Sequence, residues 1–169
     1  MIRLLCRCIR PVNQLAGMLA MLLIVYITGH ILLEIVMRLF GTSTFVLDEF
    51  IGYAVASMTF LGLGYALERG SLVRVNVLLD RLPTRWHWLP DLVSTLSALA
   101  AFAWLAWFWG QSVWRSYQRG TLSETLAETP LWIPESMVLV GMLLLCLTLL
   151  SRALHLVSER SLPPHTRVN

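Results

Sequence analysis

Four long apolar runs divide the 169-residue chain, and polar segments separate them. The runs cover about residues 12–36, 45–67, 89–111 and 131–151. Each holds about 20 residues or more, which lets a helix rising about 1.5 Å per residue cross a hydrocarbon core of about 30 Å. Helices also satisfy their own backbone hydrogen bonds in lipid. The pattern predicts an all-α integral membrane protein with four transmembrane helices, forming one membrane domain over residues 1–169.

The composition agrees with this interpretation. Hydrophobic residues make up 57% of the chain and charged residues 14%, and the mean hydropathy is +0.68. A soluble domain carries roughly 25% charged residues, so the alternative of an apolar soluble helical bundle leaves few polar side chains for a surface. The pI near 9.1 does not indicate nucleic acid as a partner, because the basic residues flank the apolar runs instead of forming one patch.

The arginines predict the orientation of the helices. All 13 basic residues are arginines, and ten of them lie before the first run, between the second and third runs, or after the fourth. Four spans place these three segments on one side of the membrane. Because segments rich in arginine stay in the cytoplasm, we expect both termini and the connector between the second and third spans to be cytoplasmic.

The connector between the second and third runs has a helical period of its own. Arg74, Arg81 and Arg85 fall on one stripe of a helical wheel, and leucines and valines occupy another. This favours a short amphipathic helix lying in the inner interface and ending near Pro83. The alternation in "LVRVNV" leaves a strand open as the alternative, although a strand would place an unpaired edge beside the membrane.

Tryptophans mark the expected membrane interfaces. Trp86 and Trp88 lie at the inner start of the third run, whereas an outer group lies at its end and at the start of the fourth run, as expected for interfacial belts. The outer group consists of Trp107, Trp109, Trp114 and Trp132. Trp104 lies deeper, and we expect it to pack against another helix.

An ionisable triplet lies in the first run. His30, Glu34 and Arg38 follow one another at four-residue intervals and so share one face of a helix. A glutamate inside a span is a functional-site hypothesis, and a proton-coupled exporter would have one. The sequence favours a structural alternative in which Glu34 and Arg38 form an i,i+4 pair near the outer interface and His30 hydrogen-bonds within the bundle.

The second run opens with "TSTFVLDE". Thr42, Ser43 or Thr44 is expected to cap the helix, and Asp48 and Glu49 lie near its positive N-terminal end. Small residues follow that allow close helix packing in lipid. They are Gly52, Ala56, Gly62 and Gly64 in the second run and Ser94, Ala98 and Ala101 in the third.

Candidate chemistry is sparse. Cys6 and Cys8 form a C-x-C pair, and Cys146 lies inside the last run. This arrangement implies neither a disulfide framework nor a zinc site. No two histidines are expected at one membrane depth, as two axial haem ligands would require. We therefore predict no catalytic, cofactor-binding or metal site.

The order of features resembles the small membrane subunit (DctQ-type) of tripartite ATP-independent periplasmic (TRAP) transporters. The resemblance is concentrated in "DEFIGYAVASMTFLGLGYALERGSLVRVNVLLDRLP" and in "RGTLSETLAETPLWIPESMVLVG". Asn76 and Val73 depart from the family's usual aspartate and His-Ile pair. The residues that fit the family's pattern are Glu49, Tyr53, Phe60, Gly62, Arg69, Gly70, Arg74, Val75, Pro83, Gly120, Ser123, Pro130, Trp132 and Pro134.

The resemblance implies a non-catalytic scaffold. In such transporters a soluble periplasmic protein delivers an organic acid or related solute to a large subunit of the elevator type, and a sodium gradient drives uptake. The implied partners are the large permease subunit, the periplasmic solute-binding protein and membrane lipids, in the bacterial inner membrane. Candidate interface or structural residues are Glu34, Arg38, Glu49, Tyr53, Gly62, Arg69, Arg74, Trp104, Pro130 and Trp132.

Two other functions stay open on the sequence alone. One is a small self-sufficient proton-coupled exporter that acts as a homodimer through Glu34. The other is a membrane redox enzyme or cytochrome, for which the sequence lacks ligands. An exporter moves its substrate without any partner, whereas a scaffold does not transport alone.

Overall fold

The computed structural model describes residues 2–70 and 88–159, which form four α-helices. They are α1 (Ile2–Leu39), α2 (Leu47–Glu68), α3 (Trp88–Arg119) and α4 (Trp132–Glu159). All four are long and apolar enough to cross a membrane. Within the described ranges the extended backbone pairs only at an isolated bridge between Leu122 and Pro130. The prediction of an all-α chain with four membrane-length helices is confirmed.

The helices extend past the apolar runs. Polar flanks continue the helix at both ends of α1, and α3 runs on to Arg119 instead of stopping near residue 111. At 38 residues, α1 is about 57 Å long, nearly twice a hydrocarbon core of about 30 Å. Part of α1 therefore lies outside the hydrocarbon core or is accommodated by tilt.

Glycines set where α1 and α3 end. Gly41 and Gly120 have φ angles of 75° and 58°, in the left-handed region that glycine adopts without cost. The residue after each glycine donates its backbone N–H to a carbonyl five residues back, from Thr42 to Met37 (3.1 Å) and from Thr121 to Ser116 (3.1 Å). These are Schellman-type ends, and they turn the chain into its two loops.

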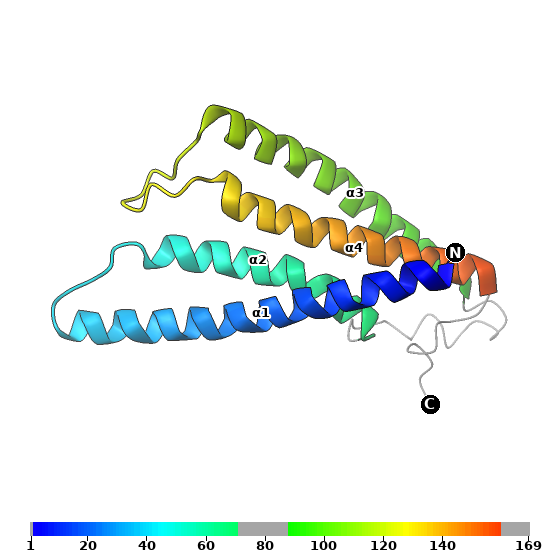
Figure 1. The fold of residues 1–169 in the computed structure, drawn as a ribbon, viewed down its shortest axis with the longest axis horizontal. Coiled ribbons are helices and arrows are strands. Elements are labelled where there is room, and N and C mark those ends of the chain that lie inside the picture. Colours follow the sequence, from blue (N-terminus) through cyan, green and yellow to red (C-terminus); the bar gives the residue numbers. More distant parts are fainter. Residues whose placement is uncertain (1, 71–87, 160–169) are drawn as a thin grey trace.

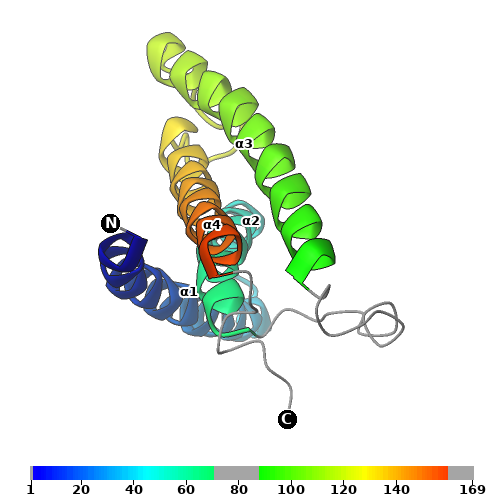
Figure 2. The ribbon, with the colours of Figure 1, turned by 90° about the vertical axis from the view of Figure 1, so that its right-hand side faces the viewer.

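The helices pack in the spatial order α1, α2, α4, α3 (Figures 1 and 2). The central pair, α2 and α4, contacts α1 on one side and α3 on the other, and α3 packs almost entirely on α4. Residues 40–46 and 120–131 lie together at one end of the bundle, which we call the loop end. The start of α1 and the end of α4 lie at the opposite end, which we call the terminal end.

Large apolar side chains point outward and small ones inward. On α1, Leu22 and Val25 are 64% and 69% exposed, whereas Ala16 and Ala20 are buried against Leu61 of α2. In water such a surface would promote aggregation, but in a membrane it faces lipid. α4 is the most enclosed helix: 44% of its most apolar window is buried, against 11% for α1 and for α3.

Two helices come into close contact at Gly141. A Cβ atom there would lie 2.6 Å from the carbonyl carbon of Phe60 and 2.8 Å from the amide nitrogen of Leu61. The backbones of α2 and α4 thus touch, as small residues allow in membranes. Gly17 makes a similar approach to the ring of Tyr65, where a Cβ would lie 2.7 Å from the ring.

The small residues identified in the sequence differ in whether they contact another helix. Gly62 faces Ala20 of α1, and Ala56 packs against the cluster of α3 and α4 residues around Met142. Gly52 makes no close contact within the described residues, because nothing lies within 4 Å of its Cβ position. On α3, Ser94 and Ala101 are exposed, so this face is not covered by the described part of the chain.

We expect Gly141→Ala to lower the free energy of unfolding by about 1–3 kcal/mol, the usual range for overpacking a filled contact. Alanine normally favours a helix over glycine, so the loss would come from the clash with the α2 backbone. Unfolding in mixed micelles with increasing sodium dodecyl sulfate, followed by circular dichroism, measures it. Gly52→Ala is the matched control and should be neutral or slightly stabilising. Equal stability of the two variants would contradict the contact.

Candidate functional site

Several polar side chains of the helices connect one part of this chain to another. Four such connections are present, and we call them polar ties. Two lie at the loop end, around Glu34 and Glu49. Two lie at the terminal end, around Asn13 and between Asp91 and Arg152. Across residues 2–70 and 88–159, no three His, Cys, Asp or Glu side chains are grouped so that they could hold a metal ion.

Glu34 fastens the loop between α1 and α2. Its side chain is only 2% exposed, and it accepts hydrogen bonds from the backbone N–H (3.2 Å) and hydroxyl (2.6 Å) of Thr44 and from the hydroxyl of Ser43. Arg38 Nε donates to it at 3.1 Å. The Glu34–Arg38 pair expected from the sequence is confirmed.

The expected cap of α2 is wrong. The N-cap position is Val46, and no side chain caps the helix. Ser43 and Thr44 instead donate to Glu34, because the loop folds back over the end of α1, and Thr42 donates to the carbonyl of Met37 at 3.0 Å. The three hydroxyls therefore stabilise α1 and the loop rather than the start of α2.

This arrangement leaves Glu34 little freedom to act on a solute. Both carboxylate oxygens already accept hydrogen bonds, and the group is almost fully enclosed. His30, the third member of the triplet, contacts Tyr26 of its own helix instead, with its Nδ1 3.4 Å from the tyrosine hydroxyl. The geometry favours a fastening role for Glu34 over a proton-coupled transport site.

Glu49 connects α2 to the long loop between α3 and α4. Its carboxylate accepts a hydrogen bond from Tyr53 (3.0 Å), one turn later, and another from Thr125 at the tip of the loop. The bridge between Leu122 and Pro130 and a backbone hydrogen bond from Leu131 to Thr121 (3.1 Å) close the base of the loop. Two predicted site residues, Glu49 and Tyr53, thus meet in one tie.

Aromatic residues hold the ends of α3 and α4 together beside this loop. Trp132, at the start of α4, packs edge-on against Tyr117 of α3 with ring centroids 5.7 Å apart. Trp109 donates its indole N–H to the backbone carbonyl of Glu135 at 3.1 Å. Pro130 and Trp132 therefore lie where the loop returns to the bundle, consistent with a structural role.

Asn13 forms the first tie at the terminal end. It is fully buried, and its amide donates to Thr148 of α4 (2.9 Å) and to Glu68 of α2 (3.1 Å). Its amide oxygen lies close against Gly64, where a Cβ would be 3.0 Å away. Arg10 adds an ion pair with Glu68 at 3.7 Å. One asparagine thereby connects three helices.

The second tie is a buried ion pair between α3 and α4. Arg152 Nη2 donates to both carboxylate oxygens of Asp91, at 2.8 and 3.1 Å, and each side chain is only 11% exposed. Such a pair is strongly destabilising to break, because removing one partner takes the opposite charge away from a largely enclosed side chain. It anchors the start of α3, the helix with the fewest contacts in the bundle.

The sequence analysis missed both terminal-end ties. Asn13 lies at the start of the first apolar run, and Arg152 was grouped with the flanking charges of the last. A signal was available: Asp91 and Arg152 lie at ends of the third and fourth runs that the predicted topology places on the same side of the membrane. Opposite charges at one depth on two spans are expected to pair.

Two of the remaining candidate residues, Arg69 and Trp104, lie at the surface. Arg69 follows α2, with its guanidinium 5.1 Å from the centroid of the Tyr65 ring. Trp104 was expected to pack against another helix, but it is 74% exposed, so no helix in the described part of the chain covers it. Arg74 and the expected interfacial helix lie outside the described residues.

The loop end carries exposed apolar side chains on loops that the ties hold in place. Leu39, Phe40, Phe45 and Leu126 are 76–81% exposed. Phe45 has a φ angle of 58°, a left-handed conformation that a bulky residue adopts only when its surroundings impose it. The adjacent bonds of Ser43 and Thr44 to Glu34 supply that constraint.

Comparison with known proteins identifies the family. The model of the DctQ component of tripartite ATP-independent periplasmic transporters matches residues 27–159. This covers most of the chain, including all or part of the four helices, and the chain belongs to that family. No curated protein and no solved structure gave a match.

We expect Glu34→Ala to loosen the loop between α1 and α2. The substitution removes the acceptor for Ser43, Thr44 and Arg38, and losing hydrogen bonds to a charged group costs about 1.5–3 kcal/mol. Hydrogen exchange measured by mass spectrometry should show faster exchange of the Thr44 amide. Asp48→Ala, at an exposed carboxylate nearby, should leave that amide unchanged. If the Thr44 amide exchanges at the same rate in Glu34→Ala, Glu34 does not hold the loop in place.

Proposed function

We propose that this small TRAP transporter subunit is the stationary, non-catalytic part of the membrane complex. It scaffolds the large elevator-type subunit and helps to dock the periplasmic solute-binding protein while a sodium gradient drives uptake of an organic acid or related solute. The large permease subunit carries the solute and sodium sites in this proposal, and the present chain does not select the solute.

One observation carries the proposal. Three ionisable side chains of low exposure in the spans, Glu34 (2% exposed) and Asp91 and Arg152 (11% each), are engaged in ties within the chain. A transporter that acts alone needs ionisable or polar groups open to its substrate pathway. A scaffold needs helices held firmly to one another and an apolar exterior for lipid and partners, which fits the described residues.

The orientation we propose places the loop end in the periplasm. The arginine distribution supports cytoplasmic termini and a cytoplasmic connector over residues 71–87 in the bacterial inner membrane, where an amphipathic helix with Arg74 would lie along the inner leaflet. The loop end then faces the solute-binding protein. Its charged residues Arg38, Arg115, Arg119, Glu124 and Glu128 would supply polar contacts in the periplasm.

The face of α3 that residues 2–70 and 88–159 leave uncovered is our proposed contact with the large subunit. Trp104 is 74% exposed there, and Ser94 and Ala101 are exposed small residues of the kind that let helices approach closely. The exporter hypothesis lacks comparable support, because its proposed proton site is the enclosed carboxylate of Glu34.

The test is reconstitution with and without the partner. The tagged chain is expressed alone and together with a large TRAP permease subunit encoded beside it, purified in mild detergent and placed in liposomes with the solute-binding protein. We expect a one-to-one complex and sodium-driven uptake only when both membrane subunits are present. The chain alone should transport nothing.

Two controls sharpen this experiment. Liposomes with the large subunit alone test whether that subunit needs the scaffold, and a reversed sodium gradient should abolish uptake. A chain that purifies as a homodimer, ignores the large subunit and moves protons or cations by itself would refute the scaffold proposal and restore the exporter.

A further inference from the structure

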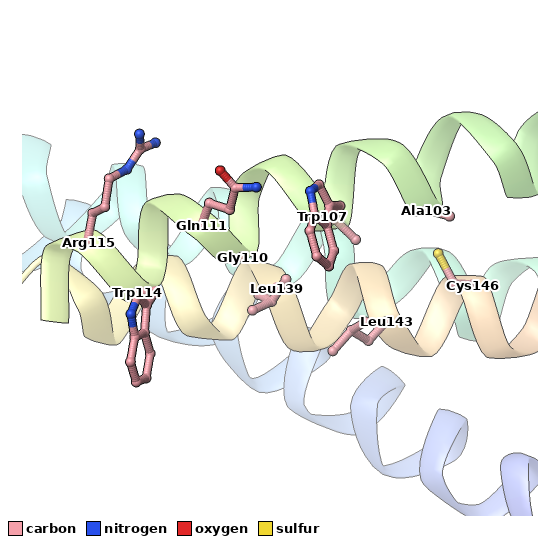
Figure 3. Close-up of a pocket in the computed structure, with 10 residues that line it drawn as sticks. Ala103, Trp107, Gly110, Gln111, Trp114, Arg115, Leu139, Leu143 and Cys146 are labelled. Atoms are coloured by element: carbon pink, nitrogen blue, oxygen red, sulfur yellow. The ribbon is translucent and has the colours of Figure 1, made fainter. Parts of the chain in front are cut away.

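A groove of about 620 Å³ runs along the contact between α3 and α4 (Figure 3). Small residues of α3, Ala103, Ala106 and Gly110, form part of its lining, and Leu139 and Leu143 of α4 complete the apolar part. Trp107 and Trp114 flank it and are 70% and 62% exposed. The groove is therefore apolar over most of its length and open at the surface.

Polar residues lie at only one end of the groove. Arg115 and Gln111 lie toward the loop end, whereas Ala103 and Cys146 mark the deeper end (Figure 3). Neither Arg115 nor Gln111 has a hydrogen-bond or ion-pair partner among the residues the structure describes. Gln111 lies two turns inside a candidate membrane span, where an unsatisfied amide is costly. Both side chains are thus free to bind a polar group from outside the described residues.

The dimensions of the groove match one leaflet of a bilayer. Residues 103 to 115 of α3 extend about 18 Å along the helix axis, and half of a hydrocarbon core of about 30 Å is about 15 Å. The polar end coincides with Trp114, a residue type that favours the membrane interface. An occupant of the groove would therefore have a charged head at the interface and an apolar part reaching to mid-membrane.

From these observations we propose that the α3–α4 groove is a binding site for one anionic phospholipid, with an acyl chain along Ala103, Ala106 and Leu143 and the phosphate at Arg115. The amide of Gln111 donates to the phosphate or glycerol oxygens. Charge complementarity at a single end favours a lipid over a helix of another protein, because an apolar helix would leave Arg115 and Gln111 without acceptors. The inference is independent of the proposed scaffold role.

Native mass spectrometry of the full chain tests the proposal. The protein is purified alone in mild detergent, delipidated, and titrated with 1-palmitoyl-2-oleoyl phosphatidylglycerol or the corresponding phosphatidylcholine. We expect one phosphatidylglycerol per chain, bound more tightly than phosphatidylcholine. Glycerol phosphate without acyl chains should not bind.

Two pairs of variants assign the site. Arg115→Gln should weaken phosphatidylglycerol binding about fivefold, the loss expected for one arginine near an anionic membrane surface, and Arg119→Gln, one turn further along α3 and outside the groove lining, should not. Ala103→Trp fills the groove and should remove the bound lipid, whereas Ala101→Trp on another face of α3 should retain it.

Three results would overturn the assignment. Equal affinities of Arg115→Gln and Arg119→Gln for phosphatidylglycerol would show that Arg115 does not bind the headgroup. Retention of the lipid by Ala103→Trp, with its helical circular dichroism intact, would place the lipid elsewhere. Loss of the lipid when the large subunit binds, with Cys146 cross-linking to that subunit, would show that a protein helix fills the groove. If Ala103→Trp does not fold, the arginine pair still decides.

Discussion

The bundle depends on a constraint imposed by lipid: apolar surface gains little by leaving one apolar environment for another, so helices must be held by close packing and by hydrogen bonds. The contact of Gly141 with the α2 backbone provides the first of these, and it makes α2 and α4 a central pair. α1 is then fixed on α2 by Asn13, and α3 on α4 by the Asp91–Arg152 pair. The two outer helices are therefore attached by polar ties at the terminal end.

The polar ties also determine which side chains and loops remain available to contact other molecules. Glu34 and Glu49 hold the two loops at the loop end, so these loops present Phe45 and Leu126 on a fixed base. Glu34, Asp91 and Arg152, three charged side chains of low exposure, are bound within the chain, whereas Gln111 and Arg115 of α3 lie at its surface. This organisation is what the proposed role as a stationary part of the transporter requires.

The sequence predicted the features that depend on local pattern. Apolar run length identified the four spans, and four-residue spacing on one helix predicted the Glu34–Arg38 pair, because both follow from the geometry of a single helix. The order α1, α2, α4, α3 could not be predicted, since it depends on which glycines meet which backbones. Gly17 and Gly141 matter and Gly52 does not, yet all three look alike in the sequence.

The polar ties between residues far apart in the sequence could not be predicted either, because they depend on how the helices pack. Ser43 and Thr44 are residue types that cap helices by accepting hydrogen bonds from the first N–H groups. Here their hydroxyls donate to the buried carboxylate of Glu34 on α1 instead, so tertiary structure decided their partner. Asn13 and Asp91 were isolated polar residues in apolar runs, whose partners lie 135 and 61 positions further along the chain.

The central claim is that charges within the spans hold this chain together and take no part in transport. The most direct measurement compares Asp91→Leu, Arg152→Leu and the double substitution, each assembled with the large subunit, for unfolding free energy and for sodium-driven uptake. Each single change should cost about 3–5 kcal/mol, and the double apolar replacement should recover most of that loss, together with uptake. A double variant that folds and assembles normally but no longer supports uptake would contradict the claim and place the pair in the transport mechanism.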